Sequence, residues 1–310
     1  MQEFLEILGS AALYAAAVRL LVPLLFAAIG EIFAERAGLV NVGLEAMMLM
    51  GAFGGVLGAV DTGSAVLGLI IGVACGVTVA AIQAAIAINL GGNQIVSGIA
   101  LNIAVLGLTS FLALTIWRNG NVPPVPGFGI LDLPALASIP FLGTVLFRQT
   151  VFVYVAIIAV PVAWWAMTRT TWGLRLRACG EDPRAVDSLG IPVLGLRWQT
   201  MLIAGALAGL GGVFISLADV MTFSNDISAG RGFIALAVVI IARWSPVKAV
   251  FAALLFGGLE ALALRLQTTN LHLPTDLLLA LPYVATLLVY AGVVGRTVAP
   301  AALGRSYTRA

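Results

Sequence analysis

Long apolar runs constrain this chain more than any other feature of its sequence. Stretches of about 20 apolar residues, the length a helix needs to cross the hydrocarbon core of a bilayer, recur along most of the chain. Of the 310 residues, 61% are apolar and only 10% are charged. A soluble domain carries about 25% charged residues. The sequence therefore predicts an integral membrane protein and excludes a soluble one.

The apolar runs predict an all-α polytopic bundle of about nine transmembrane helices, in which residues 1–310 form a single transmembrane domain. The first run contains Arg19, and the seventh is too short to cross a flat bilayer core. The predicted spans are 11–29, 39–60, 66–88, 94–117, 149–167, 199–217, 230–242, 249–264 and 277–294.

The arginine and lysine residues predict an orientation, because cytoplasmic loops of membrane proteins are enriched in them. If the loop 168–198 is cytoplasmic, alternation of the spans places most basic residues on that side. They are Arg36, Arg169, Arg175, Arg177, Arg184, Arg197, Arg243, Lys248, Arg296, Arg305 and Arg309. This predicts a cytoplasmic C terminus and an external N terminus. Glu3 and Glu6, in place of a basic start, argue against a signal peptide.

Polar residues gather where the first two predicted spans meet, in the stretch GEIFAERAGLVNVGLEAMMLMGAFGG at 30–55. Asn41 and Glu45 are four residues apart, which predicts that they share one helical face. An ionised carboxylate is costly inside a bilayer, so Glu45 is expected to have a specific role. Two roles fit: Asn41 and Glu45 line a solute path, or Glu45 hydrogen-bonds a neighbouring helix for structure alone.

A second polar stretch, NLGGNQIVSGIALN at 89–102, begins the fourth predicted span. Two glycines interrupt the chain, and Asn93 is expected to cap the helix that follows. Gln94, Ser97 and Asn102 then fall in the first half of that helix, too many polar groups for a lipid-facing surface. They are further candidates for the solute path.

The loop 172–198 reads WGLRLRACGEDPRAVDSLGIPVLGLRW. Glu181, Asp182 and Pro183 are typical of a helix start, and Gly190 of a helix end. A short helix on the cytoplasmic side suits docking to a soluble partner. The alternative is an ordinary charged loop that only fixes the topology, and the residues alone leave both open.

Two further features concern the C-terminal half. Short, glycine-flanked segments such as the seventh span often mark broken helices beside a solute route in transporters. The alternative is that 219–229 contains the missing part of that helix. Glu260, inside the eighth span, is expected to pair with Arg265 at its end.

Together these stretches resemble the permease subunits of bacterial type II ATP-binding-cassette (ABC) importers for simple sugars, nucleosides and branched-chain amino acids. They are most similar to the nucleoside or simple-sugar subgroup. The resemblance covers nearly the whole chain and is carried by Gly30, Glu31, Glu35, Arg36, Ala37, Gly38, Asn41, Gly43, Leu44, Glu45, Asn93, Gln94, Ser97, Gly98, Asn102, and by 180–185 and 232–237. Two departures are the apparent lack of an extra N-terminal helix and Ala46 where the subgroup often has glycine.

The resemblance implies a transport subunit that works by alternating access and depends on a separate ATPase. The loop 168–198 would be a coupling loop, with a coupling helix formed by Gly180, Glu181, Asp182, Pro183, Arg184, Ala185, Val186 and Asp187. This chain has no Gly-x-x-x-x-Gly-Lys-Ser/Thr run to hold phosphates. We therefore expect it to be no enzyme and to bind no cofactor, with ATP and Mg²⁺ used by the partner ATPase.

The implied partners are an ABC ATPase subunit, expected to be a double-domain protein, a second homologous permease, an extracytoplasmic solute-binding lipoprotein and membrane lipid. The implied location is the bacterial inner membrane. Nucleosides are the first substrate class, simple sugars the second and branched-chain amino acids the third. The sequence has no basic cluster with interleaved aromatic residues, so nucleic-acid binding is not predicted.

Other classes of protein have less support in the sequence. A secondary, ion-coupled transporter needs carboxylates near the bilayer midplane and usually an inverted repeat. Only Glu45 and Glu260 are partial candidates, and no repeat is obvious. An intramembrane enzyme would need a nucleophile–base pair, and none stands out in this sequence. Cys75, Cys179 and the single histidine, His272, are dispersed, so neither a disulfide nor a metal site is predicted.

Overall fold

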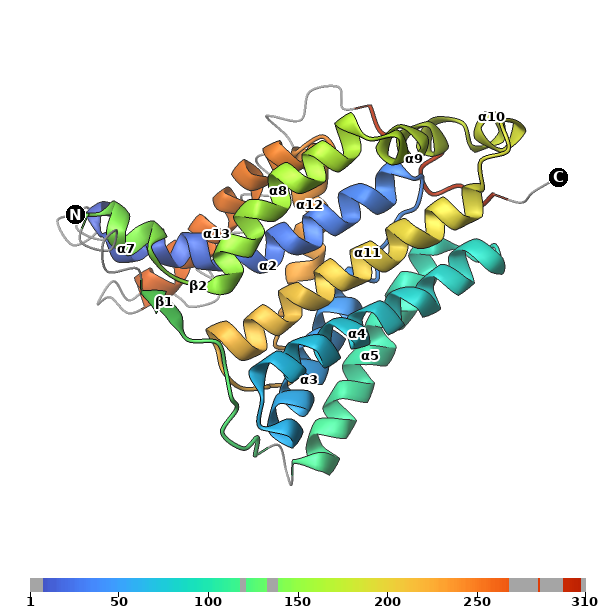
Figure 1. The fold of residues 1–310 in the computed structure, drawn as a ribbon. Helices are drawn as coiled ribbons and strands as arrows, with labels where there is room; N and C mark the ends of the chain where they lie inside the picture. The colour runs from blue at the N-terminus through green and yellow to red at the C-terminus, as the bar shows by residue number, and fades with distance from the viewer. Residues whose placement is uncertain (1–7, 118–120, 133–138, 268–283, 285–297, 308–310) are drawn as a thin grey trace.

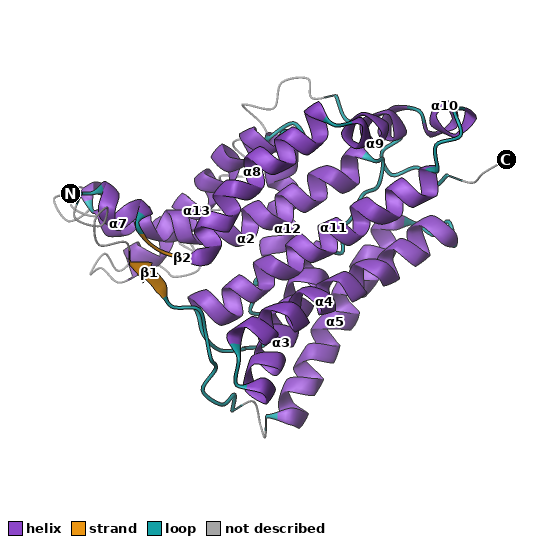
Figure 2. Cartoon of the chain, viewed as in Figure 1, coloured by secondary structure: helices purple, strands orange, loops and turns teal. Residues whose placement is uncertain are grey.

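The computed structural model describes residues 8–117, 121–132, 139–267, 284 and 298–307, and it is built almost wholly of helices (Figures 1 and 2). Within these residues, seven helices are long and apolar enough to cross a membrane. They are α2 (Ala11–Arg36), α3 (Leu44–Thr62), α4 (Ala65–Ala84), α5 (Gln94–Ile116), α8 (Val151–Arg169), α11 (Val193–Phe214) and α13 (Pro246–Gln267). Single π-helical turns continue α4 over Ala85–Asn89 and α11 over Ile215–Asp219. The all-α membrane bundle is confirmed.

The short seventh span is also present, as α12 (Arg231–Ile241). Residues 220–230 before it form turns in place of a helix, and Met221, Asp226 and Ala229 have positive φ values. The alternative that 219–229 completes this helix is therefore wrong. The ninth predicted span, 277–294, lies outside the described residues, and the count of about nine stays approximate.

Small elements occupy the two ends of the bundle. At one end, β1 (Ile130–Asp132) pairs antiparallel with β2 (Arg148–Thr150) beside α7 (Leu142–Leu146). At the other end lie α9 (Thr171–Glu181) and α10 (Pro183–Ser188), together with the C-terminal residues (Figure 1).

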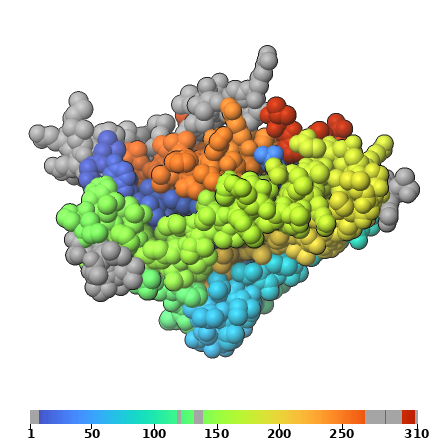
Figure 3. Space-filling model, turned by 45° about the horizontal axis from the view of Figure 1, so that its top comes forward, coloured from blue at the N-terminus to red at the C-terminus, as the bar shows by residue number. Residues whose placement is uncertain are grey.

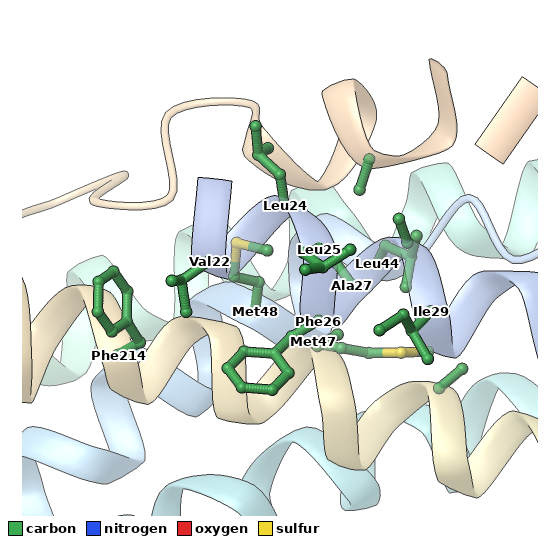
Figure 4. Packing of buried hydrophobic residues seen from close by; sticks show 14 of the residues in the cluster. Val22, Leu24, Leu25, Phe26, Ala27, Ile29, Leu44, Met47, Met48 and Phe214 are labelled. Carbon is green, nitrogen blue, oxygen red and sulfur yellow. The ribbon is translucent and has the colours of Figure 1, made fainter. Parts of the chain in front are cut away.

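The core forms around α2 and α11, which lie antiparallel beside each other (Figure 1). α13 packs on α2, while α3 and α4 pack on α11. Every residue of α2 from Leu20 to Glu35 is buried, so this part of the helix is enclosed by protein on all sides. Figure 4 shows its apolar side chains interleaved with Met47, Met48 and Phe214.

Close helix contacts depend on glycine. A Cβ on Gly212 of α11 would lie 1.9 Å from the Met48 carbonyl oxygen of α3. A Cβ on Gly51 of α3 would lie 2.6 Å from the Gly209 backbone, and one on Gly76 of α4 would lie 2.8 Å from the Gly209 Cα. The glycines therefore let α3, α4 and α11 meet backbone to backbone.

The junction between the first two spans differs from the prediction. α2 continues as a helix to Arg36, through both Arg19 and Pro23, and α3 begins only at Leu44. The non-helical residues 37–43, called here the α2–α3 connection, join them. Asn41 lies in this connection, so the prediction that it shares a helical face with Glu45 is wrong.

We predict that Gly212→Ala destabilises the protein, because the added methyl group has no space between α11 and α3. Overpacking of this kind typically costs about 1–3 kcal/mol. Thermal unfolding in detergent measures the effect. Gly107→Ala in α5 is the matched control, since a Cβ there meets nothing within 4 Å. Equal melting temperatures for the two variants would contradict the packing described.

Candidate functional site

Two helices begin in contact with each other inside the bundle. α3 starts after Gly43 and α12 after Gly230. A Cβ on Gly232 would lie 2.5 Å from the Glu45 nitrogen and 2.6 Å from the Glu45 Cα, so the two backbones touch. The first turn of a helix has unpaired N–H groups and a partial positive charge. Two such ends meeting away from water require acceptors from elsewhere in the chain.

Glu45 supplies the acceptors for α12. Its Oε1 accepts the N–H of Gly230 at 2.9 Å, and its Oε2 accepts the N–H of Gly232 at 2.7 Å. The side chain is 7% exposed, and it lies in the first turn of α3. One carboxylate therefore joins the starts of both helices. This is the interhelical bond that one of the two sequence interpretations of Glu45 expected.

Two asparagines supply the acceptors for α3. The Oδ1 of Asn102 accepts the N–H of Ala46 at 2.9 Å, and its Nδ2 donates to the Val42 carbonyl at 2.9 Å. The Oδ1 of Asn41 accepts the N–H of Gly43 at 3.2 Å. α5 thus holds the start of α3 through a side chain 56 residues away in sequence.

The α2–α3 connection is fastened by buried polar groups on both sides. Glu31 of α2 accepts the N–H of Asn41 at 2.9 Å, and the Oε1 of Gln94 accepts the N–H of Val40 at 2.7 Å. The Gln94 carbonyl accepts from Gln83 at 2.9 Å and from the Ser97 hydroxyl at 3.2 Å. Gln94 and Ser97 were candidates for the solute path, and their polar atoms take part in this support.

A cavity of about 550 Å³ lies beside the paired helix starts. Of the predicted path residues, Glu45 and Asn102 line it, whereas Asn41, Gln94 and Ser97 do not. The remaining lining residues are Ala46, Leu49, Ile99, Ile103, Leu106, Asp226, Ala229, Gly230 and Phe233. The walls are mainly apolar with a few acceptor groups, and no lysine or arginine of the described residues lines them. Mainly apolar walls with a few polar groups are typical of small-molecule sites, and the acceptor groups here suit a solute that carries hydroxyl or amino donors.

Sequence reasoning missed Asp226 and Phe233 among the lining residues. The short span 230–242 was a signal for this region, but turns such as 220–230 show no periodicity that would place their side chains. Glu260 also differs from its prediction. It forms a salt bridge with Arg231 at the start of α12, a partner that the sequence did not predict.

The loop between α8 and α11 contains the predicted short helix. Asp182 caps α10 by accepting the N–H groups of Arg184 at 3.0 Å and Ala185 at 3.1 Å, and Pro183 is its first residue. Val186 is buried, whereas Arg184, Ala185 and the following Leu189 are exposed. α10 therefore presents a mixed polar and apolar surface at the end of the bundle.

The end of α9 touches the end of α2. A Cβ on Gly180 would lie 2.2 Å from the Arg36 carbonyl oxygen, so no side chain separates the two helices. Arg36 is followed directly by the α2–α3 connection, which leads to Glu45. The residues 37–44 are therefore all that separates this contact from Glu45 along the chain.

The chain matches a protein family described as branched-chain amino acid transport system permease component over residues 13–294. It is 37% identical to a putative glucose ABC transporter permease of Haloferax volcanii, covering 97% of this chain and 98% of that protein. It is 37% identical to a nucleoside ABC transporter permease of Lactococcus lactis, and 35% identical to a guanosine ABC transporter permease of Bacillus subtilis, with 93% of each chain covered. No solved structure matches the chain significantly.

We predict that Glu45→Ala lowers the stability of the bundle, since each of the two buried N–H groups left unpaired costs about 1–3 kcal/mol. Glu45→Gln should lie between Glu45→Ala and the unsubstituted protein, because its amide oxygen can accept from only one of them. Thermal unfolding in detergent is the measurement. Asp226→Asn, at an exposed residue of the same cavity, is the control and should leave the melting temperature unchanged. A Glu45→Ala protein as stable as the control would show that Glu45 does not join the two helices.

Proposed function

Because this chain belongs to the branched-chain amino acid transport system permease family and is a multi-pass permease subunit of an ABC importer, we propose that its solutes are nucleosides. Simple sugars are the second candidate class and branched-chain amino acids the third. The names of the nucleoside, guanosine and glucose permeases support this order. All three relatives are named as ABC transporter permeases, so the ion-coupled alternative has no comparable support.

The observation that carries the proposal is the cavity at the paired starts of α3 and α12. In this proposal, solutes pass along it, and the Glu45 and Asp226 carboxylates and the Asn102 amide accept hydrogen bonds from hydroxyl or amino groups. Both carboxylate oxygens of Glu45 already accept a backbone N–H, which leaves limited capacity for a solute. Weak binding suits a conduit, since a solute held tightly would not leave it.

The partners follow from the architecture of this transporter class. ATP and Mg²⁺ are bound by a separate, double-domain ATPase, and an extracytoplasmic solute-binding lipoprotein delivers the solute. The coupling helix at 180–187 docks on the ATPase, with Arg184, Ala185 and Leu189 as the exposed contact residues. The chain lies in the inner membrane with the α10 end in the cytoplasm and the start of α2 outside, since Arg169, Arg175, Arg177 and Arg243 lie near the α10 end.

A second, homologous permease completes the conduit. The exposed side chains of α5 are mainly apolar, and Ile99, Ile103 and Leu106 of this helix also line the cavity. A wall that is partly open along α5 would be closed by the partner permease. Lipid covers the remaining apolar faces of the bundle.

Reconstitution tests the proposed function. We expect the purified chain to carry an ATPase subunit and a second permease with it. Vesicles containing the assembly and its binding protein should take up radiolabelled guanosine or adenosine only with ATP. Uptake driven by a proton or sodium gradient, without ATP, would contradict the proposal. Uptake of glucose in place of nucleosides would favour the second substrate class.

We predict that Arg184→Ala combined with Leu189→Ala reduces ATP-driven uptake by about tenfold or more, because both side chains of the docking surface are lost. The protein should still insert and fold, since both residues are exposed. Lys248→Ala, exposed at the start of α13 at the same end of the bundle, is the control. Normal uptake by the double variant would remove α10 from the docking surface.

A further inference from the structure

The C-terminal residues 298–307, called here the C-terminal segment, lie against the loop that contains α9 and α10. The N–H of Ala302 donates to the Gly180 carbonyl at 2.8 Å, and the N–H of Gly304 donates to the Gly38 carbonyl at 3.0 Å. Figure 3 shows the C-terminal residues (red) beside the yellow-green atoms of this loop. The segment therefore bridges the end of α9 and the α2–α3 connection.

A buried arginine fixes the segment from beneath. Arg197 at the start of α11 is 1% exposed. Its Nη1 donates to the Arg305 carbonyl at 3.0 Å, and its Nε donates to the Ala37 carbonyl at 3.3 Å. Burying a guanidinium is costly unless it is hydrogen-bonded, so these backbone acceptors make the position of the segment part of the fold.

The segment also covers the apolar support of α10. Tyr307 packs on the buried cluster of Cys179, Val186, Val193 and Leu196. Burial raises the pKa of the Cys179 thiol, although Arg197 beside it acts in the opposite direction. Cys179 should therefore react slowly with thiol reagents while the segment is in place.

A cavity of about 490 Å³ opens between the segment and α10. Glu181, Asp182 and Arg184 form one wall, and Arg305, Ser306 and Tyr307 form the other. Within the described part of the chain, the hydrogen bonds of Arg184 and Arg305 are made by their backbone groups, and both side chains are exposed. Of the two acids in the cavity wall, Glu181 accepts the N–H of Ala301 at 3.3 Å and Asp182 accepts two N–H groups of α10. The exposed Arg184 and Arg305 guanidiniums can therefore donate to a carboxylate of a bound partner.

We propose that the ATPase subunit docks on both walls of this cavity, so that the C-terminal segment is the second half of the docking surface and α10 the first. This rests on the proposed function, in which α10 contacts the ATPase. The cavity is continuous with α10, so a partner seated on that helix also meets Arg305 and Ser306. An acidic side chain of the ATPase would enter between Arg184 and Arg305.

The experiment measures the affinity of the ATPase that co-purifies with the wild-type chain for two variants in detergent. Arg305→Glu reverses a charge while its carbonyl can still accept from Arg197. Ser306→Trp fills the cavity from the segment side. Lys248→Glu, outside the cavity, is the matched control. We expect both segment variants to weaken binding by about tenfold or more, and the control to bind as the wild type does.

Labelling of Cys179 by a maleimide, in a Cys75→Ala background, reports whether the segment stays packed. Weaker ATPase binding with Cys179 still protected supports direct docking. Wild-type affinity in Ser306→Trp overturns the proposal, whether or not Cys179 is protected. Weaker binding only where protection is lost also overturns it, because the segment would then act by positioning α10. If the wild-type chain binds no ATPase at all, the proposed function itself fails.

Discussion

The contact between the starts of α3 and α12 sets the conditions for the rest of the bundle. Inside a membrane protein, every backbone polar group must find a partner within the protein. Two helix starts that touch present their unpaired N–H groups to each other, and their partial positive charges repel. Glu45 resolves both problems, since one carboxylate accepts two N–H groups and carries the opposite charge. Asn41 and Asn102 then complete the bonding of α3.

The same residues support the helices and line the cavity. Glu45 and Asn102 hold the helices in place and also line the adjoining cavity. Their hydrogen-bonding capacity is largely occupied by backbone groups, which leaves a solute few strong partners. If solutes pass along this cavity as proposed, selectivity would rest mainly with the protein that delivers them.

Local sequence patterns predicted the features that depend on residues close together in the chain. Hydropathy predicted the spans within the described residues, and the Asn93 cap and the helix start at Pro183 lie where the turn and helix residues placed them. The start of α3 was not predictable in this way, because Leu39, Val40 and Val42 read as helix. Their non-helical path depends on Glu31 and Gln94, which come from other elements. The pairing of Glu260 with Arg231 crosses 29 residues, beyond the reach of helical spacing.

The glycine contacts among α3, α4 and α11 limit how the protein can change shape. Backbones that meet without intervening side chains cannot slide past one another without collision, since packed interiors shift between discrete arrangements and do not deform continuously. These three helices should therefore travel as one rigid block. The remaining freedom lies where contacts are sparser, along α5. A hinge there would let the block of α3, α4 and α11 tilt as a unit. Because these helices are long, a small displacement near α10 would become a larger one at the opposite membrane face.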